Sequence, residues 1–145
     1  ERVFKQLDAI WRVFKDRGIR YSSITTTSVE SKTLLAQHVR LIGDSTKGSQ
    51  ANCADGSVLF ASVFRKIGLN AFLVKLPGHM MVGVGLDKNN KTVTFIETTV
   101  VSSKTFGEAI YSEKDMLKKY KKSQIKMVNI NAARKAGFLP LRDLN

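Results

Sequence analysis

The sequence predicts an α+β fold in which helices pack against an antiparallel sheet. Three observations support this prediction. Apolar residues recur at spacings of three and four at the start of the chain and again after Cys53, as in amphipathic helices. Three short apolar segments then follow between residues 71 and 98, where the helical period is lost. A polar stretch, Asp-Lys-Asn-Asn, separates the last two of these segments and is typical of a hairpin turn.

The first part of the chain predicts two helices separated by extended chain. Residues 2–17 form an amphipathic helix that Gly18 ends, with apolar positions at Val3, Leu7, Ile10, Trp11 and Phe14. Residues 19–31 are rich in β-branched and hydroxyl side chains, which indicates extended chain or a short edge strand before a polar loop. A second helix is expected over residues 32–42 with Ser31 as its cap, followed by a loop over residues 44–52.

The central helix is expected from Cys53 to Ile67. Two adjacent apolar lines along this segment give it a wide buried face, made of Leu59, Val63 and Ile67 with Phe60 and Phe64 beside them. Gly68 supplies a left-handed cap. Strands then follow at 71–76, 79–86 and 92–98, and the signals after Thr99 predict a helix over 113–121, a last strand over 125–131 and a loose tail.

Composition fits one domain over residues 1–145 with an ordinary hydrophobic core. The net charge of +12 is compatible with an acidic protein or peptide substrate, an anionic envelope polymer or nucleic acid. Nucleic acid is the least expected of these partners, because no basic run is interleaved with stacking aromatic residues. No apolar run reaches the roughly 20 residues of a transmembrane helix. The start at Glu1 indicates trimming, so a cytoplasmic and an exported or envelope location both stay open, as does the oligomeric state.

A single cysteine, Cys53, excludes an intramolecular disulfide and a cysteine-rich zinc site. The two histidines and the scattered carboxylates show no metal-ligand spacing, and no cofactor is expected. The chemistry of a lone cysteine therefore has to come from the thiol itself.

Three residues make up a candidate catalytic group: Cys53, His79 and Glu97. Cys53 opens the central helix, where unpaired backbone N–H groups and the helix dipole stabilise a thiolate. His79 begins one arm of the predicted hairpin and Glu97 lies near the end of the other, so antiparallel pairing brings them side by side to within one residue of register. An imidazole oriented by a carboxylate is a suitable base for a thiol nucleophile.

Taken singly, each residue has a structural interpretation: a small buried thiol, a turn histidine and a solvent-facing glutamate. Taken together, their placement favours chemistry. An oxyanion site would use the Cys53 N–H with the side-chain amide of Gln50 or Asn52.

At these residues the chain resembles the transglutaminase-like superfamily of papain-type cysteine enzymes, in particular its small bacterial members. The resemblance covers roughly residues 17–141 and is strongest over 48–99, with Cys53 opening a helix that ends in RKIGL, Gly78-His79 opening a strand, and FIETT at residues 95–99. It implies a papain/transglutaminase-like core, with the cysteine helix on an antiparallel sheet that carries His79 and the acid.

The resemblance also implies acyl transfer on amide bonds through a thioester, with Cys53 as nucleophile, His79 as base and Glu97 as the orienting acid. The family usually has Asp at the acid position and other residues at the position of Asn52, and its cross-linking enzymes often have an aromatic residue where Ala54 stands. The absence of that aromatic residue favours peptidase- or amidase-type hydrolysis over cross-linking. The alternative is a non-catalytic transglutaminase-like module that binds a partner within a larger protein.

Overall fold

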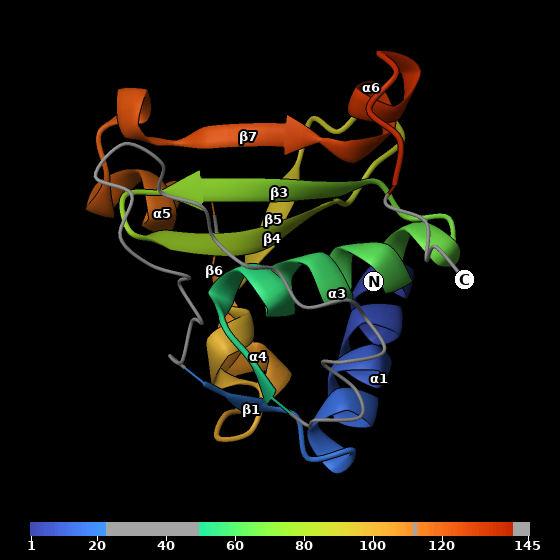
Figure 1. Cartoon of the computed structure of the whole chain (residues 1–145), viewed down its shortest axis with the longest axis vertical. Coiled ribbons are helices and arrows are strands. Elements are labelled where there is room, and N and C mark those ends of the chain that lie inside the picture. Colours follow the sequence, from blue (N-terminus) through green and yellow to red (C-terminus); the bar gives the residue numbers. More distant parts are fainter. Residues whose placement is uncertain (23–49, 112, 141–145) are drawn as a thin grey trace, which may run out of the picture.

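A five-stranded antiparallel sheet forms the centre of the computed structural model, which describes residues 1–22, 50–111 and 113–140 (Figure 1). The strand order is β6-β5-β4-β3-β7. The strands are β3 (Ala71–Leu76), β4 (His79–Gly85), β5 (Val93–Ile96), β6 (Ile110–Tyr111) and β7 (Lys126–Asn129). The predicted α+β class with an antiparallel sheet is therefore confirmed.

The two long helices, α1 (Arg2–Asp16) and α3 (Cys53–Lys66), form because their apolar residues fall on one side. In α1 the buried side chains are Leu7, Trp11 and Phe14. Both helices are followed by a glycine with positive φ, +71° at Gly18 and +85° at Gly68, a conformation that other residues rarely adopt. The predicted bounds of these helices agree with the structure to within one residue at each end.

Aromatic side chains join the two helices. The Phe60 ring of α3 lies 4.7 Å from that of Phe14 and 5.6 Å from that of Trp11, measured between centroids. Phe64, one turn further along α3, lies 5.7 Å from Phe60. All four rings are buried in the cluster that also contains Val82, Val84 and Ile96 of the sheet. Burial of these large apolar surfaces is the main force that holds α1 and α3 on the sheet.

The central strands are buried on both faces. In β3, Phe72, Val74 and Leu76 contribute to a second cluster with Met81, Phe95 and Met116 of α5 (Glu113–Lys119). Ala71 and Leu73 alternate with these residues and belong to the cluster of α1 and α3. The sheet therefore has one face toward α3 and the other toward α5.

The β4–β5 hairpin closes through the predicted Asp-Lys-Asn-Asn turn. The Asp87 carboxylate accepts hydrogen bonds from the N–H groups of Asn89, Lys91 and Thr92, and Asn90 has a φ of +53°. Val82 pairs with Ile96, and this register differs by one residue from a turn centred between Lys88 and Asn89. The strands are also slightly shorter than predicted.

The smaller elements depart most from the sequence predictions. The strand β1 (Arg20–Tyr21) lies where extended chain or a short edge strand was predicted. It pairs in parallel with β2 (Gln50–Ala51), which lies inside the segment predicted as a loop. The tail after β7 is not loose up to residue 140, because α6 (Ile130–Lys135) follows at once with Asn129 as its cap. Four further elements were not predicted: η1 (Thr98–Val100), α4 (Phe106–Ala109), the strand β6, and η2 (Lys122–Gln124), which follows α5. The helix expected over 32–42 and its cap Ser31 lie outside the described residues.

None of the helices in the described ranges is both long and apolar enough to span a membrane.

Candidate catalytic site

His79 and Glu97 form a direct side-chain pair. The imidazole Nε2 lies 2.5 Å from Glu97 Oε2, and the exposed fractions of the two side chains are 26% and 13%. His79 is the first residue of β4, and Glu97 follows directly after the last residue of β5. The pair therefore lies at one end of the sheet and is partly shielded from solvent. The sequence predicted that these two residues lie side by side, but not that they are shielded.

The observed register explains how the two side chains meet. Extending the pairing of Val82 with Ile96 by one residue places Met81 opposite Glu97. His79 is two residues from Met81, so it shares a sheet face with Glu97 at a diagonal position. Diagonal neighbours are about 7–8 Å apart, a separation that the long glutamate and the imidazole can bridge. The extra methylene of Glu relative to Asp suits this spacing.

Each partner changes the titration of the other. The hydrogen bond that His79 donates to the Glu97 carboxylate raises the pKa of His79, and this effect outweighs the partial burial that lowers it. Burial raises the pKa of Glu97, but hydrogen bonds from His79 and Thr99 outweigh it and hold the pKa below its usual value. Both shifts favour an imidazolium–carboxylate pair.

Thr99 holds the other oxygen of the Glu97 carboxylate. Its backbone N–H donates to Oε1 at 3.1 Å and its hydroxyl at 2.6 Å, so Glu97 also caps the short helix η1. With both carboxylate oxygens engaged, the direction of the carboxylate toward His79 is defined by the backbone. Sequence reasoning missed Thr99, because glutamate is not among the residues preferred at a helix N-cap and gave no capping signal here.

Cys53 is the first residue of α3 and is partly exposed. Asn52 caps the helix: its side-chain oxygen accepts from the Asp55 N–H at 2.8 Å, and the Asp55 carboxylate accepts from the Asn52 N–H at 3.1 Å. This capping box gives the buried Asp55 a structural role at the start of α3. Within the described ranges, the backbone N–H groups of Cys53 and Ala54 have no hydrogen-bond partner.

The first turn of α3 packs directly on η1. Gly56 approaches Thr98 so closely that a Cβ at this glycine would lie 2.7 Å from the Thr98 hydroxyl. Cys53 and Gly56 are three residues apart and so lie on one side of the helix. Because Thr98 follows Glu97 in the chain, this contact brings the start of α3 to the residue that binds His79.

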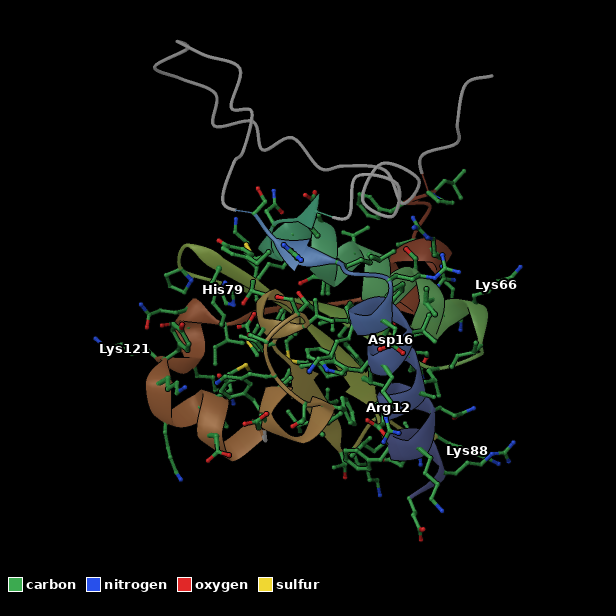
Figure 2. The ribbon with its side chains drawn as sticks, turned by 90° about the horizontal axis from the view of Figure 1, so that it is seen from below. Arg12, Asp16, Lys66, His79, Lys88 and Lys121 are labelled. Atoms are coloured by element: carbon green, nitrogen blue, oxygen red, sulfur yellow. The ribbon has the colours of Figure 1, made fainter. Side chains whose placement is uncertain are left out.

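The two views agree on this placement. Figure 1 shows that α3 begins at the end of the sheet where β3 turns into β4. Figure 2 shows His79 at that same end, far from Lys88 in the β4–β5 turn. In the described part of the chain, however, no hydrogen bond joins the Cys53 thiol to His79. Because Nε2 is bound to Glu97, Nδ1 is the imidazole nitrogen available to a thiol.

The structure describes only one of the two side chains that were predicted as donors of an oxyanion site, that of Asn52. Asn52 is buried and its oxygen is committed to the helix cap, which leaves its amide nitrogen as a donor. The backbone of Gln50 pairs with Arg20, and its side chain lies outside the described part. No group of three or more His, Cys, Asp or Glu residues suited to a metal ion occurs among the residues described.

Comparisons with family models, with curated proteins and with solved structures found no match to this chain.

Proposed function

We propose that this protein is a cysteine-dependent acyl transferase acting on amide bonds, with peptidase- or amidase-type hydrolysis as its reaction. The observation that supports this most strongly is the bonded pair of His79 and Glu97 at the end of the sheet where α3 begins with Cys53. Under this proposal the helix, the hairpin and the acid form a papain/transglutaminase-like core.

In the proposed reaction, Nδ1 of His79 takes the proton of the Cys53 thiol, and Sγ forms a bond to the carbonyl carbon of the amide. The C–N bond then breaks, and the imidazolium gives its proton to the leaving amine. Water attacks the resulting thioester while His79 accepts one of its protons, which releases the acid and restores the thiol. Glu97 fixes the imidazole so that Nδ1 faces the thiol.

Backbone donors at the start of α3 suit the charge that develops on the carbonyl oxygen. The N–H groups of Cys53 and Ala54 are unpaired among the described residues, and they lie at the positive end of the helix dipole. We assign the first donor to the Cys53 N–H. The Asn52 amide nitrogen is the second candidate, since its oxygen is already engaged with Asp55.

The test is the rate of Cys53 alkylation by iodoacetamide against pH, in the unaltered protein, His79→Ala and Glu97→Gln. We expect Cys53 to react fast at neutral pH in the unaltered protein. The reaction should be slowest in His79→Ala and intermediate in Glu97→Gln. Lys88→Gln, far from the site, is the control and should leave the curve unchanged.

A free-thiol curve that ignores both substitutions would refute the proposed activity. That outcome would favour the second candidate, a non-catalytic module that binds a partner. The observation that favours this second candidate is the lack of a hydrogen bond between Cys53 and His79 in the described structure.

A further inference from the structure

Two lysines face each other across neighbouring strands of the sheet. Lys75 of β3 is directly opposite Lys126 of β7, and both are exposed. Directly opposed residues have Cβ atoms about 4.5–5.5 Å apart, and like charges in that position destabilise a sheet. Neither lysine has a salt-bridge partner within the described residues. The fold therefore tolerates an uncompensated pair of positive charges here.

The pair lies on the α3 side of the sheet. Lys75 alternates with Val74, which faces α5, and shares its face with Leu73 and Ala71 of the α3 cluster. Lys75 is one residue before the end of β3, and Lys126 begins β7. Figure 1 shows that this end of both strands is the end at which α3 starts, so the pair lies at the same end of the fold as Cys53 and His79.

More lysines precede Lys126 along the chain. Lys121 and Lys122 are exposed in and before η2, and Figure 2 shows Lys121 on the same side of the molecule as His79. We call Lys75, Lys121, Lys122 and Lys126 the lysine edge. No aromatic side chain among the described residues of η2 and β7 is available for stacking on a base, which disfavours single-stranded nucleic acid as its ligand.

We propose that the lysine edge binds the acidic side chains of a peptide substrate and so positions its scissile amide near Cys53. This inference rests on the proposed function, since it names the substrate class of that site. A carboxylate bound between Lys75 and Lys126 would neutralise their opposed positive charges. Two ammonium groups without a salt-bridge partner among the described residues therefore favour an acidic side chain as their ligand.

Binding is tested without turnover, using Cys53→Ser protein and a fluorescein-labelled peptide of alternating Glu and Gly residues. Removing two exposed ion pairs should weaken binding about three- to tenfold in Lys75→Gln/Lys126→Gln. The matched control is Lys88→Gln/Lys91→Gln, which removes the same charge from exposed positions at the other end of the hairpin. The control should change affinity less than about twofold, since its charges lie more than a Debye length away.

Three outcomes would overturn the inference. The first is that the peptide does not bind at physiological salt. The second is that both double variants lose affinity equally, which would mean that only the total charge matters. The third is that single-stranded RNA binds more tightly than the peptide and depends on Lys75 and Lys126, which would make nucleic acid the ligand. Circular dichroism of each variant confirms that it is folded.

A second measurement tests the distance to the thiol. At low salt the lysine edge should favour anionic iodoacetate over neutral iodoacetamide at Cys53, and Lys75→Gln/Lys126→Gln should lower that rate ratio roughly twofold or more. If the ratio of the two alkylation rates is unchanged in this variant, Lys75 and Lys126 lie too far from Cys53 to position a substrate there. The proposed function and this inference can fail separately, because peptide binding is measured on Cys53→Ser protein and needs no reactive thiol. Alkylation by iodoacetamide that ignores His79→Ala and Glu97→Gln would refute the proposed function. Failure of the protein with an unaltered lysine edge to bind the peptide would refute this inference.

Discussion

Nε2 of His79 and Oε2 of Glu97 are 2.5 Å apart, although the two residues occupy diagonal rather than opposite positions at the end of the β4–β5 hairpin. The glutamate also accepts two hydrogen bonds from Thr99. Each of its oxygens is thus occupied, one by the imidazole and the other by the start of η1. The geometry of the pair therefore depends both on the register of β4 and β5 and on the start of η1 at Thr99.

The first prediction concerns the titration of His79. Because the Glu97 hydrogen bond is the largest cause of its raised pKa, NMR titration of the imidazole should give a value above about 6.5 in the unaltered protein. In Glu97→Gln only the effect of burial remains among the causes that shift it, and the pKa should fall below that value. His79→Ala assigns the signal. Equal pKa values in the two proteins would contradict the bond.

The pair should also make stability depend on pH in a defined way. Its contribution through His79 is present below about pH 6.5 and is lost as the pH rises through the higher pKa of the folded state. Its contribution through Glu97 is present above about pH 4.5 and is lost as the pH falls through the lower pKa of the folded state. The free energy of unfolding lost in Glu97→Gln should therefore be largest between these two values.

Urea unfolding of both proteins from pH 3 to 8.5 measures this difference. Glu108→Gln is the matched control, because hydrogen bonds from Thr105 lower the pKa of Glu108 without a histidine partner. The free energy of unfolding lost in Glu108→Gln should disappear only as the pH falls into the acid range and should not change as the pH rises. If the free energy of unfolding lost in Glu97→Gln stays constant up to pH 8.5, the protonation of His79 does not depend on its bond to Glu97.

Gly56→Ala should disturb the contact between α3 and η1. The new Cβ would lie 2.7 Å from Thr98 Oγ1 and 3.2 Å from Thr98 Cβ, in a buried place. Overpacking of this kind costs about 1–3 kcal/mol, which exceeds the roughly 1 kcal/mol that alanine contributes to a helix. Because Thr98→Ala removes the nearer atom, it should restore part of the loss in the double variant.

A double-mutant cycle on the free energy of unfolding measures this coupling, expected at about 0.5–3 kcal/mol. Gly107→Ala in α4 adds the same methyl group where no neighbour lies within 4 Å and should show no such dependence on Thr98. If the losses in free energy of unfolding from Gly56→Ala and Thr98→Ala simply add, α3 does not pack against η1 at these two residues.

Asn52→Ala removes the cap of α3. The expected loss is about 1 kcal/mol of stability, with a slower alkylation of Cys53 at neutral pH because the first turn is less well ordered. Asn129→Ala removes a cap of the same type from α6 and is the control. It should lower stability by a similar amount and leave the reactivity of Cys53 unchanged. Slower alkylation of Cys53 in both variants would mean that the effect comes from a general loss of stability and not from the cap of α3.

Phe60→Ala should destabilise the fold by about 3–5 kcal/mol, since Phe60 is buried and contacts the rings of Trp11, Phe14 and Phe64. Val13→Ala in α1 is the control, because this side chain is half exposed. Thermal unfolding of both variants checks the difference. Similar losses would mean that α1 does not pack through this aromatic cluster.

Periodicity predicted the long elements well. The bounds of β3 agree with the prediction, and those of α1 and α3 differ from it by one residue, because apolar spacing and a following glycine mark their ends. Short elements carry no such signal. α6 has only six residues, and it depends on the Asn129 cap and on hydrogen bonds that Asn131 makes with Asn70 and Arg65. Such contacts join residues far apart in sequence.

The candidate site was predictable in part for the same reason. The placement of His79 and Glu97 followed from strand order, but the register was wrong by one residue, since the turn is centred differently. The contact of Gly56 with Thr98 was not predictable, because η1 left no pattern in the sequence. The same limit applies to the lysine pair, which exists only because β7 returns beside β3.

The first turn of α3, the β3–β4 turn and the start of η1 all come from one uninterrupted run of the chain, residues 53–100. The His79–Glu97 pair lies within one hairpin and is separated by only 18 residues, so it can form with little loss of loop entropy. The contact of Gly56 with Thr98, which brings the start of α3 to this pair, joins residues 42 positions apart, nearly as far as Phe14 is from Phe60. The histidine–glutamate pair can therefore form before the helix that carries Cys53 docks on it.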